Sequence, residues 1–179
     1  MVSLQFAGAL VAILACGVGT YTDIKKGVIP NWLTLPTLVL GLIMGFVANS
    51  WMGFGMALLS AFATAMVPLI LFYMSAMGGG DVKLFAAIGA LLGIDLSLQV
   101  LMASFMVGAL WGIGLWSVRG EIKQRIRVAS HKLLPQRLTR IRSETTALSQ
   151  TYIKFGPAIL AGCILTMGLQ VVDVVRYGG

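Results

Sequence analysis

Six runs of apolar residues, separated by short polar segments, constrain the fold of this chain more than any other feature of its sequence. A helix needs about 20 apolar residues to cross the hydrocarbon core of a bilayer, and most of the runs reach or approach that length. Only 11% of the 179 residues are charged and 58% are hydrophobic, which leaves too little polar surface to cover a soluble globule. We therefore predict an all-α, polytopic membrane bundle of about six transmembrane helices, at about 3–20, 32–49, 54–76, 82–94, 97–117 and 156–175.

The distribution of positive charge predicts which helix ends face the cytoplasm, because lysine and arginine concentrate in cytoplasmic loops. With six crossings and the N-terminus outside, twelve of the thirteen lysines and arginines fall on the inner side, and only Arg176 falls outside. The segment 82–94 is short enough to be re-entrant instead, but the basic residues that follow it would then lie outside. A multi-pass membrane protein with six crossings is the preferred interpretation.

Nine of the basic residues lie between Arg119 and Lys154, in a predicted cytoplasmic loop at about 118–154. Apolar residues recur there at helical spacing, which is typical of amphipathic helices that lie on anionic lipid headgroups. Nucleic-acid binding is the weaker alternative, because no aromatic residue is interleaved with the charges before Tyr152. We predict one membrane-embedded domain over 1–179, whose basic loop contacts the bilayer, and no nucleic-acid partner.

Residue types that bind metals or act as nucleophiles are scarce in this sequence. The two cysteines, Cys16 and Cys163, lie in apolar runs, there is no Cys-x-x-Cys pair, and His131 is the single histidine. No Ser–His or Cys–His arrangement is evident that would form a nucleophilic centre. We expect no metal and no cofactor, which leaves the six acidic residues as candidates for chemistry.

Two of the acidic residues, Asp23 and Asp81, are predicted to lie at the same membrane face. Asp23 follows the first apolar segment and Asp81 precedes the fourth, so the chain between them crosses the membrane twice. Either residue alone could be a turn or helix-cap residue, but ionisable groups at membrane depth are costly and generally functional. Two neighbouring aspartates share one proton, so that one can activate water while the other protonates a peptide carbonyl. Helix dipoles favour Asp81 as the base and Asp23 as the acid.

The sequence around both aspartates resembles the type IV prepilin peptidase family, whose members are membrane aspartyl proteases with a Gly-x-Gly-Asp motif. That motif reads Gly78-Gly79-Gly80-Asp81 here, and the stretch DIKKGVIPNWLT supplies the first aspartate, Asp23. The resemblance implies that Asp23 and Asp81 are catalytic. It also implies supporting positions at Gly78, Gly80, Lys83, Pro30, Asn31 and, within FGPAIL, Pro157.

The resemblance also implies a class of substrate. This is a prepilin that carries a basic leader ahead of an apolar helix, and it is cleaved at the cytoplasmic face, commonly after a glycine. Longer family members carry an insert with Cys-x-x-Cys motifs and also methylate the new N-terminus. This sequence has no such motif, so it is similar to the short form that is associated with Flp or Tad pili.

Two other interpretations remain open on sequence grounds. Proteases of the presenilin or signal-peptide-peptidase type place a Tyr-Asp pair in one span, whereas Tyr21 lies two residues before Asp23 here. A non-enzymatic scaffold, or a small ion- or proton-coupled transporter, could use the same two aspartates. A transporter is expected to show inverted repeats and ionisable groups near the bilayer midplane.

Overall fold

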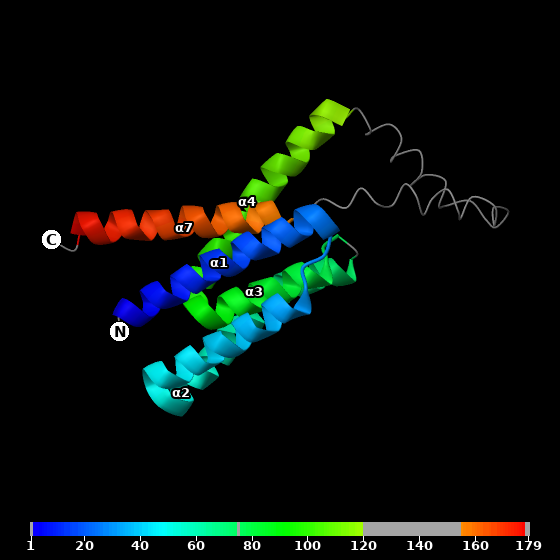
Figure 1. The fold of residues 1–179 in the computed structure, drawn as a ribbon. Helices are drawn as coiled ribbons and strands as arrows, with labels where there is room; N and C mark the ends of the chain where they lie inside the picture. The colour runs from blue at the N-terminus through cyan, green and yellow to red at the C-terminus, as the bar shows by residue number, and fades with distance from the viewer. Residues whose placement is uncertain (1, 75, 120–154, 178–179) are drawn as a thin grey trace. The chain divides into compact units, whose positions relative to one another are not determined.

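Helices account for nearly all of the residues that the computed structural model describes, which are 2–74, 76–119 and 155–177. Apolar segments become helices in lipid because a helix satisfies its backbone hydrogen bonds within its own segment. The predicted all-α class is confirmed for this part of the chain. Five helices are present in it: α1 (Val2–Lys26), α2 (Asn31–Tyr73), α3 (Gly79–Leu92), α4 (Ile94–Arg119) and α7 (Gly156–Tyr177) (Figure 1).

Three of the described helices contain a stretch that is long and apolar enough to cross a membrane: Phe6–Lys26, Asn31–Tyr73 and Ile94–Gly112. α7 has a shorter apolar stretch, and α3 has only 14 residues. Six crossings, an outside N-terminus and a single domain over the whole chain therefore stay predictions. The predicted basic loop lies outside the described residues, apart from its first two positions, which belong to α4.

α2 joins the second and third predicted segments into one element of 43 residues with a break in its middle. A straight helix of this length would measure about 65 Å, roughly twice the thickness of the hydrocarbon core. The backbone leaves helical geometry at Asn49 (φ −150°, ψ 37°) and Ser50 (φ 52°, ψ −140°). α2 turns back on itself there, so that a Cβ on Gly45 would lie 2.8 Å from the Gly53 carbonyl oxygen (Figure 1).

Both arms of α2 pack against α3 through glycines. A Cβ on Gly41, in the first arm, would lie 2.8 Å from the carbonyl carbon of Ala90. A Cβ on Gly89, in α3, would lie 2.6 Å from the carbonyl oxygen of Ser60 in the second arm. Small residues allow this close approach, as is usual where helices pack within membranes. The short helix α3 is therefore shielded by its neighbours.

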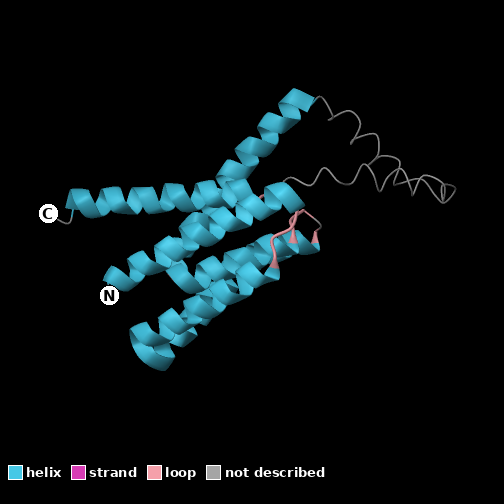
Figure 2. Cartoon of the chain, in the orientation of Figure 1, coloured by secondary structure: helices cyan, strands magenta, loops and turns pink. Residues whose placement is uncertain are grey.

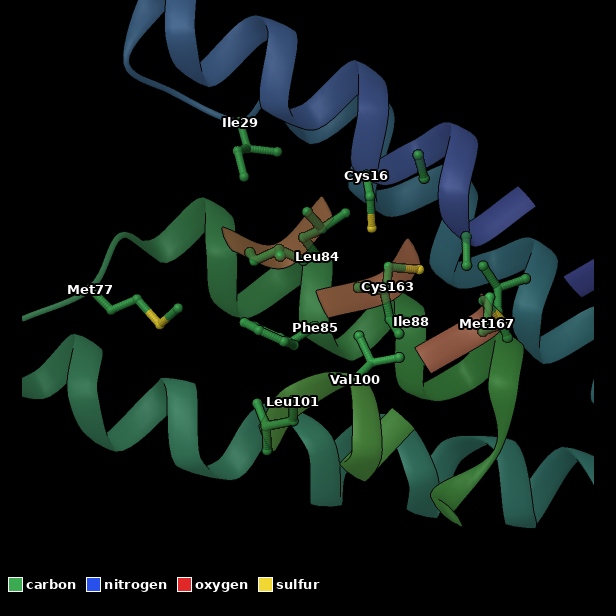
Figure 3. Packing of buried hydrophobic residues seen from close by; sticks show 14 residues of the cluster. Cys16, Ile29, Met77, Leu84, Phe85, Ile88, Val100, Leu101, Cys163 and Met167 are labelled. Atoms are coloured by element: carbon green, nitrogen blue, oxygen red, sulfur yellow. The ribbon is translucent and has the colours of Figure 1, made fainter. Parts of the chain in front are cut away.

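The core of the helical unit lies around α3 (Figure 3). Leu84, Phe85 and Ile88 of α3 are fully buried in it, and α1 and α7 contribute the free thiols Cys16 and Cys163. The described residues up to 108 and from 155 onwards belong to one compact unit, which holds every residue of the site described below.

The structure corrects two predicted helix ends at the face that carries the aspartates. α1 continues to Lys26, so Asp23 lies in its last turns rather than after it. Gly27 ends the helix with a φ of 66°, and its N–H donates to the Asp23 carbonyl oxygen across 2.9 Å. α3 begins at Gly79, so Asp81 lies inside its first turn rather than before it. The connections that follow α1 and precede α3 lie at the same end of the helices (Figure 2).

Candidate active site

Asp23 is buried at the end of α1, against the start of α7. Its exposed fraction is only 8%, which is low for a carboxylate. The Gly156 N–H donates to Asp23 Oδ2 across 3.2 Å, and the Thr20 hydroxyl donates to the Gly156 carbonyl oxygen across 2.9 Å. Thr20 and Asp23 are three residues apart and share one face of α1. Together they form hydrogen bonds with both the N–H and the carbonyl oxygen of Gly156 in α7.

Asp81 is buried in the first turn of α3, with an exposed fraction of 5%. Its Oδ2 accepts a hydrogen bond from the N–H of Gly78, the residue that precedes the helix, across 3.3 Å. Burial and, after it, the negative charge of Asp23 raise the pKa of Asp81 to about 7, against the lowering effect of the Gly78 hydrogen bond. This direction is opposite to the one expected from the helix dipole, because desolvation outweighs the nearby backbone donors.

The structure brings Asp23 and Asp81 to the same end of the helices, as the span count predicts. The two carboxyls lie close enough for the charge of Asp23 to contribute to the raised pKa of Asp81. A pair of this kind can supply one proton acceptor and one proton donor near neutral pH. No group of three or more His, Cys, Asp or Glu side chains that could hold a metal occurs among the described residues.

The glycines before Asp81 allow the loop after α1 to pack directly on the start of α3. A Cβ on Gly80 would lie 2.9 Å from the Ile29 Cβ and 3.2 Å from the Ile29 carbonyl oxygen, so this approach requires glycine. A Cβ on Gly79 would meet only the ring edge of Phe72, at 3.2 Å. Gly78 has ordinary extended backbone angles (φ −80°, ψ 146°). It contributes to the site through its N–H.

The other supporting residues shape the elements around the two carboxyls. The Lys83 ammonium donates to Asn31 Oδ1 across 2.8 Å and so links α3 to α2. Pro30 directly precedes α2 with an extended backbone (φ −75°, ψ 144°). Pro157 is the second residue of α7, where the missing proline N–H removes no helical hydrogen bond.

Sequence reasoning missed Thr20 and Gly156 as parts of this site. Two signals were available, since Thr20 lies three residues before Asp23 and Gly156 directly precedes Pro157. Neither signal shows that they meet, because Thr20 and Gly156 are 136 positions apart and only the folded chain joins them.

Two buried aspartates at one end of an apolar helical bundle are the arrangement expected of a membrane aspartyl protease. Residues 10–113 match the model of the type IV leader peptidase family, and the chain belongs to that family. Both aspartates lie within the matched region. The family predicted from the two motifs is thereby confirmed, at the level of the family as a whole.

Several curated proteins are similar to the chain. It is 38% identical over 100 residues to prepilin peptidase EppA of Methanothermobacter thermautotrophicus, an alignment that covers 53% of this chain and 26% of that protein. It is 37% identical over 109 residues to the prepilin leader peptidase/N-methyltransferase of Aeromonas salmonicida, and this alignment covers 57% of this chain and 37% of that protein. A protein of the same name from Legionella pneumophila is 32% identical over 126 residues, and the alignment covers 66% of this chain and 44% of that protein. The chain thus spans less than half the length of these relatives. No solved structure matches it significantly.

Proposed function

We propose that the chain is a membrane aspartyl endopeptidase that removes the leader peptide of type IV prepilin-like substrates, with Asp23 and Asp81 as its catalytic residues. The observation that carries this proposal is the pair of buried carboxyls, one of which has a pKa raised to about 7. Membership of the type IV leader peptidase family supports it. The names of the relatives, which state prepilin peptidase activity, support it as well.

Peptide hydrolysis by this pair needs one ionised and one protonated carboxyl. The ionised carboxylate takes a proton from water while the water oxygen bonds to the peptide carbonyl carbon. The protonated carboxyl gives its proton to the carbonyl oxygen, which produces a neutral gem-diol. When the C–N bond breaks, the first carboxyl returns its proton to the leaving nitrogen, and the gem-diol returns one to the second. The raised pKa of Asp81 favours Asp81 in the protonated role, the reverse of the roles expected from helix dipoles.

The proposal extends to the substrate and its orientation. The substrate is a prepilin of the Flp or Tad type, whose apolar helix lies among the helices of the chain with its scissile bond, commonly after a glycine, level with the aspartates. Lys25 and Lys26 at the end of α1, and Lys83 in α3, support a cytoplasmic location for this end. The chain would then span the bacterial inner membrane six times, with its basic loop on anionic headgroups.

Leader removal from a co-expressed prepilin tests the proposed function. We expect a faster-migrating product whose mass is reduced by that of the basic leader. The Asp95→Asn variant is the matched control, because Asp95 is an exposed aspartate at the start of α4, and it should process the prepilin at the parent rate. A prepilin that stays intact beside folded chain in the membrane would overturn the peptidase proposal and favour the scaffold or the transporter.

Cleavage is expected to slow above about pH 7. The pKa of Asp81, raised to about 7, means that its carboxyl holds a proton below that pH and loses it above. If Asp81 is the proton donor, kcat/KM falls about tenfold per pH unit on the alkaline side. Initial rates of the detergent-solubilised chain from about pH 5 to about pH 9 measure this. A rate that rises through pH 7 would instead make Asp81 the base.

A further inference from the structure

A hydrogen-bonded bridge joins α1 to α7 at Asp23. It consists of the Thr20 hydroxyl, the backbone N–H and carbonyl of Gly156, and the Asp23 carboxylate, and we call it the α1–α7 bridge. The bond from Gly156 to Asp23 connects residues 133 positions apart. The two proposed catalytic aspartates lie on α1 and α3, and the backbone of Gly156 is the point at which α7 contacts this pair.

The α1–α7 bridge is packed so closely that a side chain at position 156 would displace its neighbours. A Cβ on Gly156 would lie 2.9 Å from Asp23 Oδ2, 3.1 Å from Asp23 Cβ and 3.2 Å from Thr20 Cα. Two of these three atoms belong to the backbone or its first side-chain carbon, and such atoms cannot rotate out of the way. A side chain at this position would therefore push the Asp23 carboxylate aside or move the start of α7 away from α1.

The α1–α7 bridge favours a negative charge on the carboxyl that it contacts. A backbone N–H at the N-terminal end of a helix carries partial positive charge, and its hydrogen bond stabilises a carboxylate over a neutral carboxyl. The first turns of α2 and α7 hold no acidic residue. Among the described residues, the charged groups on the helices around the site are Asp81 of α3, whose pKa the charge of Asp23 helps to raise, Lys83, which donates to Asn31, and Lys25, which donates to Tyr21. Lys26 completes the end of α1.

We propose that Thr20 and Gly156 are positioning residues that hold Asp23 as the ionised, water-activating carboxylate of the pair. This inference rests on the proposed peptidase function and assigns each carboxyl its role. Gly156 fixes one oxygen of Asp23, and Thr20 fixes Gly156 by occupying its carbonyl. Asp81 instead accepts its hydrogen bond from Gly78, at the start of its own helix, so among the described residues this bond does not connect it to a second helix. Asp81 is thus the member that keeps the shared proton.

The Thr20→Val variant tests the α1–α7 bridge, since valine keeps the shape of threonine and removes its hydroxyl. We expect kcat to fall about tenfold while KM changes less than about twofold, because one positioning hydrogen bond is lost and substrate contacts are kept. The acidic limb of the pH–rate profile should move to higher pH by about half a unit to one unit, with the alkaline limb near pH 7 unmoved. Thr20→Ser keeps the hydroxyl, so it should show the kcat and the acidic limb of the parent.

The matched control is Thr22→Val in the same helix. The Thr22 hydroxyl donates only to the Val18 and Gly19 carbonyl oxygens of α1 itself, so its loss should leave kcat and both limbs at parent values. A Thr20→Val profile identical to that of Thr22→Val would overturn the inference. Movement of the alkaline limb in place of the acidic one would also overturn it.

A second measurement separates this inference from the peptidase proposal. The chain has four aspartates, whose carboxyl carbons can be labelled with carbon-13 and followed by NMR through a pH titration in detergent. In the parent, the Asp81 carboxyl should titrate near pH 7. Thr20→Val should shift the carbon-13 signal of the Asp23 carboxyl, because the hydrogen-bonded bridge to α7 is weakened, and should leave the signal of Asp95 unchanged. An unmoved Asp23 carboxyl signal overturns the inference whether or not the chain cleaves a prepilin, whereas absent cleavage with a shifted signal overturns only the peptidase proposal.

Discussion

Asp23→Asn and Asp81→Asn are each expected to lower the rate of leader cleavage at least about 1,000-fold. An asparagine at position 23 cannot take a proton from the attacking water, and one at position 81 cannot donate a proton to the peptide carbonyl. Because the two carboxyls act as one unit, the double variant should lose little more than either single variant. Initial cleavage rates of a purified prepilin, measured on gels for parent and variants, give these ratios.

The lost activity of Asp81→Asn should not result from unfolding of the variant. The pKa of Asp81 is raised from an ordinary value near 3.8 to about 7, so the stability that protonated Asp81 contributes is complete below pH 3.8 and is lost as the pH rises through 7. Asparagine is neutral at every pH and avoids this loss. The variant should therefore unfold at a temperature equal to or above that of the parent at about pH 8. Thermal unfolding in detergent measures it.

Asp95→Asn shows whether a loss of activity is specific to Asp23 and Asp81 or follows from removing any aspartate. Asp95 is exposed at the start of α4, at the far end of α3 from Asp81, and its replacement should leave the cleavage rate unchanged. Full activity in either Asp23→Asn or Asp81→Asn would refute catalysis by the pair. The family assignment would stand in that case, because it rests on the match over residues 10–113.

The helices and the two aspartates could be predicted from sequence because the signals for them are local. Long apolar runs indicate helices in lipid, and the order of the runs places Asp23 and Asp81 at one end without any knowledge of packing. The ends of the helices could not be predicted in this way. Hydropathy marks where the apolar stretch of α1 stops, but the helix continues through polar residues to Lys26, where Gly27 ends it.

The chemistry of each carboxyl depended on contacts that the sequence does not reveal. The helix dipole is a local property, and it predicts that Asp81 is the ionised member of the pair. Burial is a property of the whole fold, and it raises the pKa of Asp81 instead. The contact of Gly156 with Asp23 likewise exists only after α7 has packed on α1. The positions of the two aspartates were thus predictable from the sequence, whereas the raised pKa of Asp81 was not.

Gly80→Ala is expected to lower kcat/KM about 100-fold, the second largest effect in this set. The new Cβ would meet the Ile29 Cβ at 2.9 Å and the Ile29 backbone oxygen and nitrogen at 3.2 and 3.3 Å. These atoms cannot rotate aside, so the first turn of α3 or the loop before α2 must move. Asp81 follows Gly80 directly, and its carboxyl would be displaced relative to Asp23. Steady-state cleavage of a purified prepilin measures the loss.

A series of alanine substitutions tests whether the loss at Gly80 comes from this contact. Overpacking of this size costs about 1–3 kcal/mol, so the Gly80→Ala chain should still fold, with a lowered unfolding temperature. Gly79→Ala meets only the edge of the Phe72 ring, which can turn, and should lose less than about tenfold. Gly55 lies in α2 with no atom within 4 Å of an added Cβ, so Gly55→Ala should keep full activity and gain slightly in helix stability.

Equal losses in Gly79→Ala and Gly80→Ala would show that the motif tolerates no side chain for some reason other than the Ile29 contact. Full activity in Gly80→Ala would show that the close approach of Ile29 to α3 does not position Asp81.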